Sequence, residues 1–234
     1  GNGYIFDQKT GDPTRTVVNG KNVINFDGND QLWTNDAFLA TSYTIMSVSR
    51  LTGGQNARLI SSKDNGWLAG YWGGRVDSFY FNDWLNQGGS FNADTNWHLH
   101  AVTMNSSDQG NTWVDFTQTT TNGNGAHNSI YAPSKLSFGA CGNLAEASKG
   151  EIAELLVFET VLSTADRQKL EGYLAHKWGL SSNLPANHPY QLKNGAALTL
   201  YWGSSDGGEN ENSWDNAVSL GKKSSPLAVW FDAS

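Results

Sequence analysis

Short apolar segments, separated by glycine, asparagine and aspartate, recur about every dozen residues between residues 22 and 159. The segments are short and rich in β-branched and aromatic residues, which is typical of β-strands. The candidate strands cover residues 22–26, 43–50, 58–62, 67–72, 76–83, 97–104, 112–117, 135–140 and 151–159. Strands at this spacing, with no helical pattern between them, predict an all-β fold: an antiparallel sandwich or jelly roll.

One segment, residues 163–178, has the spacing of a helix instead. Ser163 is placed to cap its amino end, and Asp166 follows where a carboxylate favours the positive end of the helix dipole. Apolar residues then recur at three- and four-residue spacing, namely Leu170, Tyr173, Leu174 and Trp178. Gly179 is placed to end the helix in a left-handed conformation. We therefore expect one helix that docks on the sandwich.

The sequence changes character near its end. Residues 1–195 of the 234 carry the strand pattern and the helix, and their length suits one large sandwich. Residues 196–234 consist of short strand-like pieces around a polar, glycine-rich stretch. We interpret this tail as a short β extension of the main domain, or as the start of a following β-rich module.

Composition narrows the class of partner. The formal net charge is −7 and no run of lysine and arginine occurs, so nothing favours nucleic acid or an anionic membrane. No apolar run is long enough for a transmembrane helix. Few charged residues together with many glycines and tryptophans are typical of secreted or cell-surface β-proteins. The single cysteine, Cys141, excludes an internal disulfide and is expected to be a small buried residue.

The chain resembles the concanavalin A-like lectin/glucanase superfamily in three stretches, VVNGKNVINFDGNDQL, WLAGYWGGRVDSFYF and GEIAELLVFETVLSTADRQKLEGYLAHKWGL…LPANHPY. Within that superfamily it is similar to the laminin G-like jelly rolls of large secreted or surface bacterial proteins. The resemblance covers about residues 17–192. The tail, LYWGSSDGG…SWDNA, is similar to the opening of β-repeat segments on bacterial surface proteins.

The resemblance implies two curved antiparallel sheets and a place beside other modules of the same polypeptide. Some members of the superfamily bind glycans, many carry a structural calcium ion, and some are hydrolases or lyases. Many others are adhesion modules, so the fold does not by itself decide the function.

Alternation along the stretch VDSFYFNDW, residues 76–84, indicates one apolar and one mixed face. Phe79 and Phe81 fall on the same face, which we expect to join the core. Tyr80, Asn82 and Trp84 fall on the opposite face. Aromatic rings stack on the apolar face of a sugar and an amide hydrogen-bonds its hydroxyls, so this face is a candidate sugar-binding surface.

Neighbouring segments add polar and aromatic residues to this candidate. The predicted carbohydrate-binding surface consists of Tyr71, Trp72, Arg75, Asp77, Tyr80, Asn82, Trp84 and His98. Large sandwiches also bury many aromatic rings, so the alternative is that some of these residues belong to the core. His98 and His100 share a face, where we expect a solvated or hydrogen-bonded pair rather than a zinc site.

A calcium ion is the expected cofactor. The stretch NFDGNDQL offers Asp27, Asn29 and Asp30 beside a glycine that permits a tight loop. In similar jelly rolls an early aspartate and a late strand acid share a structural ion, which here matches Asp27 and Glu154. An ordinary hydrogen-bonded turn is the alternative.

A catalytic pair of carboxylates is not evident. Retaining glycosidases need two carboxyl groups about 5–5.5 Å apart, and Glu151 and Glu154 would point to opposite faces of a regular strand. The sequence therefore favours non-catalytic binding of a polysaccharide or glycan. The alternatives are a structural or adhesive spacer, and a polysaccharide lyase or glycoside hydrolase whose site has no recognisable motif.

Overall fold

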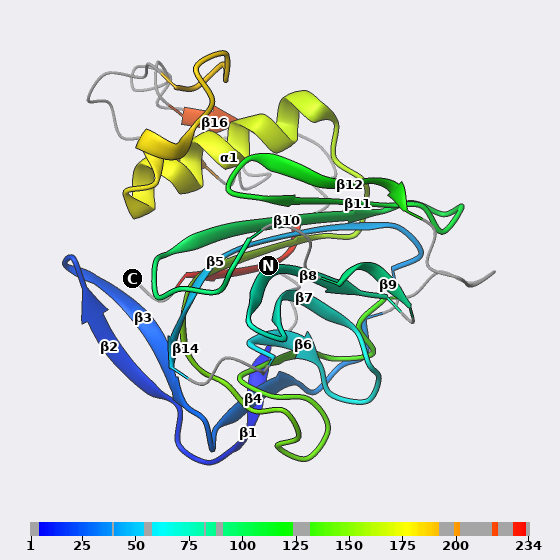
Figure 1. The fold of residues 1–234 in the computed structure, drawn as a ribbon, viewed down its shortest axis with the longest axis vertical. Coiled ribbons are helices and arrows are strands. Elements are labelled where there is room, and N and C mark those ends of the chain that lie inside the picture. The colour runs from blue at the N-terminus through cyan, green and yellow to red at the C-terminus, as the bar shows by residue number, and fades with distance from the viewer. Residues whose placement is uncertain are drawn as a thin grey trace, which may run out of the picture. The chain divides into compact units, whose positions relative to one another are not determined.

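A computed structural model describes residues 5–38, 40–53, 58–81, 83–87, 91–123, 132–191, 199–201, 217–219 and 227–232 (Figure 1). The chain forms two compact units. The first contains residues 1–161 and 227–234, and the second contains residues 162–226.

The first unit contains a seven-stranded antiparallel sheet. In spatial order its strands are β1 (Phe6–Thr10), β4 (Gln31–Thr34), β13 (Leu136–Phe138), β6 (Ile60–Ser62), β7 (Leu68–Trp72), β8 (Arg75–Tyr80) and β9 (Trp84–Gln87). The last four follow one another in the chain, so residues 60–87 build one end of the sheet as a meander.

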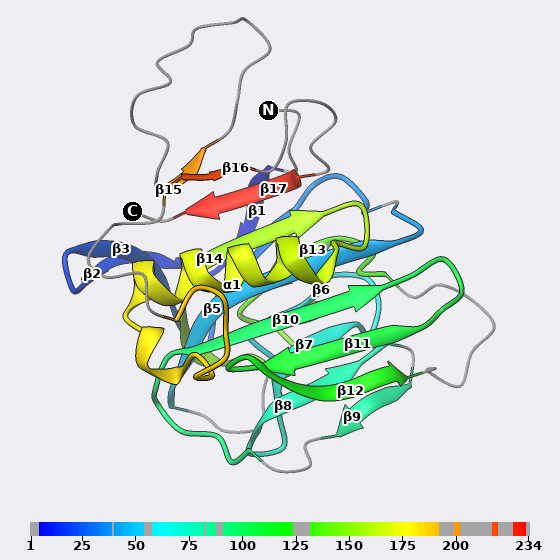
Figure 2. The same ribbon diagram turned by 90° about the horizontal axis from the view of Figure 1, so that it is seen from above.

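A second antiparallel sheet has eight strands (Figure 2). These are β12 (Thr117–Gly123), β11 (Gly110–Val114), β10 (His98–Met104), β5 (Tyr43–Gly53), β14 (Lys149–Phe158), β3 (Lys21–Asp27), β2 (Thr14–Val18) and β17 (Leu227–Asp232). Strands β3 and β17 share one edge of β14, since β3 pairs with Lys149–Ile152 and β17 with Glu154–Phe158. The predicted all-β sandwich of two antiparallel sheets is confirmed.

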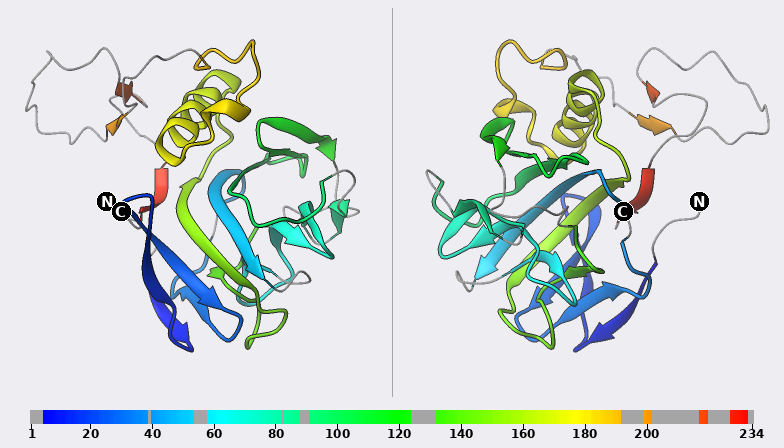
Figure 3. Two further views of the ribbon diagram at one scale, coloured as in Figure 1. Left: turned by 60° about the vertical axis from the view of Figure 1, so that its left-hand side comes forward. Right: turned by 90° about the vertical axis from the view of Figure 1, so that its right-hand side faces the viewer.

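The hydrophobic core lies between the two sheets, which form two layers (Figure 3). Phe79 and Phe81 are buried, while Tyr80 and Trp84 are partly exposed, as alternation predicts. Large core side chains from both sheets include Tyr43, Ile45, Leu51, Val102, Leu155, Ile60, Trp67, Tyr71 and Phe138.

The second unit contains helix α1 (Thr164–Trp178), the 3₁₀ turn η1 (Ser181–Asn183) and a parallel pair of short strands, β15 (Thr199–Tyr201) and β16 (Ala217–Ser219). The predicted caps of α1 are confirmed. The side chain of Ser163 accepts a hydrogen bond from the amide of Asp166, and Gly179 adopts φ 76° at the carboxyl end. The docking of this helix on the sandwich and the boundary near residue 195 stay predictions. No helix in the described part of the chain has the length and apolarity needed to cross a bilayer.

Candidate functional site

A two-residue turn sets the position of the first aromatic ring of the candidate site. Gly73 and Gly74 connect β7 to β8 with φ 58° and 77°, which is the backbone that a tight hairpin requires and glycine supplies at little cost. The turn pairs Trp72 directly with Arg75 across the two strands. Directly paired residues project from the same face of a sheet, so Trp72 and Arg75 lie side by side.

Three partly exposed rings meet on the face opposite Phe79. Tyr80 pairs with Trp84 across β8 and β9, and their ring centroids are 5.2 Å apart with the planes at 72°. The ring of Trp72 lies 6.2 Å from that of Trp84, tilted by 43°. We call Trp72, Tyr80 and Trp84 the outer aromatic cluster. The sequence predicted all three for the sugar-binding surface, and the structure brings them together.

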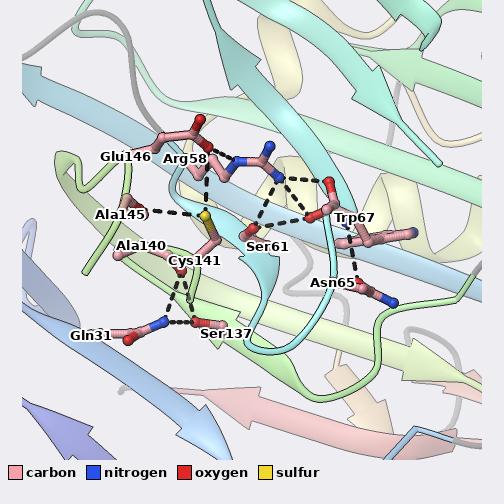
Figure 4. Close-up of polar contacts among 11 residues, drawn as sticks. Gln31, Arg58, Ser61, Asn65, Trp67, Ser137, Ala140, Cys141, Ala145 and Glu146 are labelled. Atoms are coloured by element: carbon pink, nitrogen blue, oxygen red, sulfur yellow. Dashed lines mark hydrogen bonds and ion pairs between the residues drawn. The ribbon is translucent and has the colours of Figure 1, made fainter. Parts of the chain in front are cut away.

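Arg58 supports this cluster, although sequence reasoning did not identify it. Its guanidinium lies 5.4 Å from the centroid of the Trp72 ring. One terminal nitrogen donates hydrogen bonds to the carbonyl oxygens of Gly66 and Trp67, at 2.6 and 3.2 Å, and Nε forms an ion pair with Glu146 (Figure 4). The partners come from three separate parts of the chain, so no local sequence pattern could have found them.

Cys141 is part of the same network rather than a fully buried residue. It is partly exposed, and its sulfur lies 3.5 Å from the Glu146 carboxylate and 3.5 Å from the Ala145 carbonyl (Figure 4). Burial raises the pKa of the Cys141 thiol above its ordinary value, and the Glu146 carboxylate acts in the same direction. A thiol of this kind is a poor nucleophile.

Three predicted sugar-binding residues lie in the interior instead. Tyr71 is fully buried, and its hydroxyl donates a 2.8 Å hydrogen bond to the carbonyl oxygen of Ser49 in the opposite sheet. Asp77 is only 1% exposed, and it lies two residues before Phe79, so that both side chains project to the same face of the strand. His98 is 8% exposed. These placements correct the predicted surface. Asn82 lies outside the described residues.

Arg75 remains on the surface beside the cluster. It is partly exposed, and its guanidinium donates a hydrogen bond to the side-chain oxygen of Asn92. An arginine held by a neutral amide keeps hydrogen-bond donors for a ligand, since the guanidinium has five. The surface set within the described residues is therefore Trp72, Arg75, Tyr80 and Trp84.

The histidine pair is buried and hydrogen-bonded. His98 Nδ1 lies 2.7 Å from an Asp115 oxygen and Nε2 lies 3.0 Å from an Asp94 oxygen. Burial alone would lower the pKa of His98, but the two carboxylates outweigh it and raise this pKa above its ordinary value. His100 Nε2 donates to the carbonyl oxygen of Val76 at 2.8 Å, and burial lowers the pKa of His100 to about 4.

Acid is expected to destabilise the protein through His100. Its pKa is lower in the folded state than the ordinary value of about 6.5, so the unfolded chain binds the extra proton as pH falls from about 6.5 to about 4. Titration of His100 alone lowers the free energy of unfolding by up to about 3 kcal/mol between pH 6.5 and pH 4. His98 acts differently: its raised pKa gives stability that is complete below about pH 6.5 and lost as pH rises through the folded pKa.

Urea unfolding at several pH values measures this effect in the parent and in His100→Gln, whose amide can still donate to the Val76 carbonyl. The parent is expected to lose more stability than the variant between pH 6.5 and 4. Equal losses in the two proteins would show that His100 does not titrate as its burial requires.

The predicted calcium ligands do not form one group. Asp30 is buried, and its two carboxylate oxygens accept the backbone amides of Asp12 at 2.7 Å and Asp27 at 3.0 Å. Asp27 pairs with Lys149 at the start of β14, and Glu154 is buried five residues further on, about 17 Å along a strand. Within the described ranges no cluster of three or more His, Cys, Asp or Glu side chains could hold a metal ion. The structure therefore does not support an ion shared by Asp27 and Glu154, and calcium on the loop 27–30 stays a prediction.

Asp30→Asn is expected to lower the free energy of unfolding by about 1–3 kcal/mol, because one of two part-buried backbone amides loses its acceptor. Asp27→Asn, at an exposed position, should change it by no more than about 0.5 kcal/mol. Urea unfolding with and without chelator measures both. If chelator destabilised the parent as much as Asp30→Asn does, a bound ion rather than the amide contacts would hold the loop.

A bulge in β14 changes the facing of its two glutamates. The pairing of β14 with β5 shifts register between Ile152 and Glu154, so Glu151 lies opposite Arg50 and Glu154 opposite Val48. Arg50 and Val48 are two residues apart and face the same side, so the glutamates share a face, contrary to the expectation for a regular strand. Glu151 forms a 2.7 Å ion pair with Arg50, and both glutamates are buried.

No family model and no curated protein matches this chain. Solved structures do match its fold. Domain 4 of AbnA, an extracellular arabinanase of Geobacillus stearothermophilus in complex with arabinotriose, shares 12% identity over 70% of this chain and 82% of its own, with a TM-score of 0.51. The fold is that of a jelly-roll β-sandwich.

Two toxin structures are similar to the same degree. The binding domain of Paraclostridial Mosquitocidal Protein 1 shares 13% identity, covers 72% of this chain and has a TM-score of 0.52. Botulinum neurotoxin type C, which interacts with two ganglioside molecules, shares 16% identity over 74% of this chain, with a TM-score of 0.53. This chain spans about half the length of each, at 47%. These likenesses support the predicted fold. The narrower similarity to laminin G-like domains rests on the sequence resemblance alone.

Proposed function

We propose that this chain is a non-catalytic carbohydrate-binding module of a larger extracellular protein, and that the outer aromatic cluster binds the glycan. The observation that carries the proposal is the meeting of Trp72, Tyr80 and Trp84 on the face opposite the core residue Phe79. Rings of this size left partly exposed in one place mark a recognition surface, since stacking on a sugar uses their apolar faces.

Polar groups beside the rings suit the same ligand. Arg75, paired with Trp72, retains guanidinium hydrogens that can donate to sugar hydroxyls. Solved structures of similar fold include a domain in complex with arabinotriose and a toxin that interacts with gangliosides. These are glycans on other chains, so they support the class of ligand and not its identity. A secreted or cell-surface location agrees with the composition, and the family resemblance implies a place among other modules.

Trp84→Ala tests the proposal. We expect it to weaken binding to a preferred polysaccharide by about 1–3 kcal/mol, the loss that follows removal of one aromatic stacking partner from a base. Affinity electrophoresis on plant, algal and mucin glycans, combined with a melting curve, measures binding and folding together.

Trp97→Ala is the matched control, because Trp97 is also partly exposed and also lies against an arginine, Arg50, at 4.7 Å. It should bind as the parent does. Binding that survives Trp84→Ala would place the glycan elsewhere. A parent that binds no glycan would favour a spacer, and release of product from a polysaccharide would favour an enzyme.

A further inference from the structure

The three rings of the outer aromatic cluster do not lie in one plane. The planes of Trp72 and Trp84 are inclined by 43°, and those of Tyr80 and Trp84 by 72°. Trp84 therefore has one neighbouring ring inclined to it and another that meets it edge to face. Rings at such angles do not form one flat surface.

Arg58 supports the Trp72 ring in its inclined orientation. Arg58 lies against the ring at 5.4 Å. Its guanidinium is fixed by the backbone carbonyls of Gly66 and Trp67 and by the carboxylate of Glu146, and Figure 4 shows the ion pair. Its side chain is only 11% exposed. A planar guanidinium with several fixed partners is a rigid support, and its contact with the ring is attractive.

The ion pair with Glu146 compensates the charge of Arg58. Its Nε and one terminal nitrogen are engaged by groups of the protein itself. The residue is therefore suited to orienting Trp72. Glu146 is in turn fixed to Arg58 through the backbone, since its carbonyl accepts the Arg58 amide at 2.9 Å.

This geometry restricts the class of ligand. The flat surface of a crystalline polysaccharide contacts several rings at once only when those rings are parallel and level. Rings inclined by 43° and 72° cannot all lie flat on such a surface at once. Resting on the proposed function, we propose that the outer aromatic cluster binds individual units of soluble glycan chains, not crystalline polysaccharide, and that Arg58 is the positioning residue that fixes the angle.

The first experiment compares the two physical forms of ligand. The whole chain is tested for binding to a panel of soluble polysaccharides and, by pull-down, to crystalline cellulose and crystalline chitin, with Trp84→Ala and Trp97→Ala beside it. We expect binding to a soluble glycan that falls about five- to 150-fold in Trp84→Ala, and no Trp84-dependent binding to either crystalline solid.

The outcomes separate the two proposals. Binding to a crystalline solid that is lost in Trp84→Ala would overturn the inference about soluble chains and leave the proposed function standing. Binding to neither form, or binding that does not depend on Trp84, would overturn the proposed function and this inference with it.

The second experiment tests Arg58 through Trp72. Arg58→Ala is expected to weaken binding to the soluble glycan about two- to tenfold, from loss of the contact that orients the ring. Arg58→Lys should recover part of this, because it keeps the cation but not the planar fork. In a Trp72→Ala background, Arg58→Ala should have no further effect on binding, which a double-mutant cycle measures.

Arg50→Ala is the matched control, since it removes the arginine from beside Trp97 and should leave glycan binding unchanged. Near-UV circular dichroism reports whether the tryptophan environment changes in Arg58→Ala while urea unfolding confirms that the variant is folded. If Arg58→Ala weakens binding equally with and without Trp72, Arg58 acts through the fold in general and its positioning role is refuted.

Discussion

Trp67→Ala is expected to lower the free energy of unfolding by about 3–5 kcal/mol, the usual cost of removing a large aromatic ring from a core. Trp67 is fully buried and stacks on Phe81 at 5.4 Å with the planes within 2°. Its indole nitrogen donates a 2.9 Å hydrogen bond to the hydroxyl of Tyr43, which belongs to the opposite sheet. The substitution therefore removes packing and leaves a buried hydroxyl without this donor.

Trp67→Phe is the milder companion, because it keeps a ring against Phe81 and loses the hydrogen bond to Tyr43. Urea unfolding should order the proteins as parent, Trp67→Phe and Trp67→Ala by decreasing stability. Trp97→Ala, at a partly exposed position, should cost far less. If Trp67→Ala cost no more than Trp97→Ala, the residue would not be in the core.

Tyr71→Ala is expected to cost a similar amount of stability, about 3–5 kcal/mol, and to leave the intrinsic affinity for glycan unchanged. Tyr71 is fully buried, its ring packs edge-on against His100 at 4.9 Å, and its hydroxyl bonds to Ser49 across the sandwich. Its neighbour Trp72 faces the other way and belongs to the outer aromatic cluster. Adjacent residues of one strand should thus give opposite phenotypes.

Tyr71→Phe separates the hydrogen bond from the ring and should cost about 1–2 kcal/mol in urea unfolding. Binding is measured at a temperature where each variant is folded, so that affinity is compared among folded molecules. A loss of affinity in Tyr71→Phe at full folding would return Tyr71 to the binding surface. Unchanged stability in Tyr71→Ala would contradict its place in the core.

The parts of the structure that follow from local rules could be predicted from the sequence. Phe79 and Phe81 are buried because a strand alternates its faces, and the same rule leaves Tyr80 and Trp84 outside. The caps of α1 at Ser163 and Gly179 are equally local, because they depend on residues within one turn.

Two errors in the predicted surface came from applying that same rule incompletely. Tyr71 and Trp72 are adjacent, so both could not lie on one face of a strand, and the Gly73–Gly74 turn places Trp72 on the outside with Arg75. Asp77 has the alternation of Phe79 and is buried with it. The spacing carried the signal for Tyr71 and Asp77. It did not do so for Arg75, which alternates with Asp77 and lies outside because the register of β7 against β8 shifts between Gly70 and Trp72.

Other features depend on contacts that spacing does not encode. Arg58 and Glu146 are 88 residues apart in the chain and meet only in the folded sheet. The bulge that places Glu151 and Glu154 on one face appears only in the register of β14 against β5. The two carboxylates that bond to His98 likewise come from different loops, since Asp94 precedes β10 and Asp115 follows β11.

The pairing of β17 with β14 has a consequence for how the chain can be re-engineered. Phe158 and Leu227 are partners in that ladder, so the backbone leaves the sandwich and returns to it at neighbouring points. In the sequence, residues 162–226 therefore lie between the two strands of an antiparallel pair. A short turn in their place could close the hairpin directly, since antiparallel neighbours need only a few residues to connect. The connection between Phe158 and Leu227 is thus a place where a segment of different length or sequence can be inserted without altering the pairing of β14 with β17.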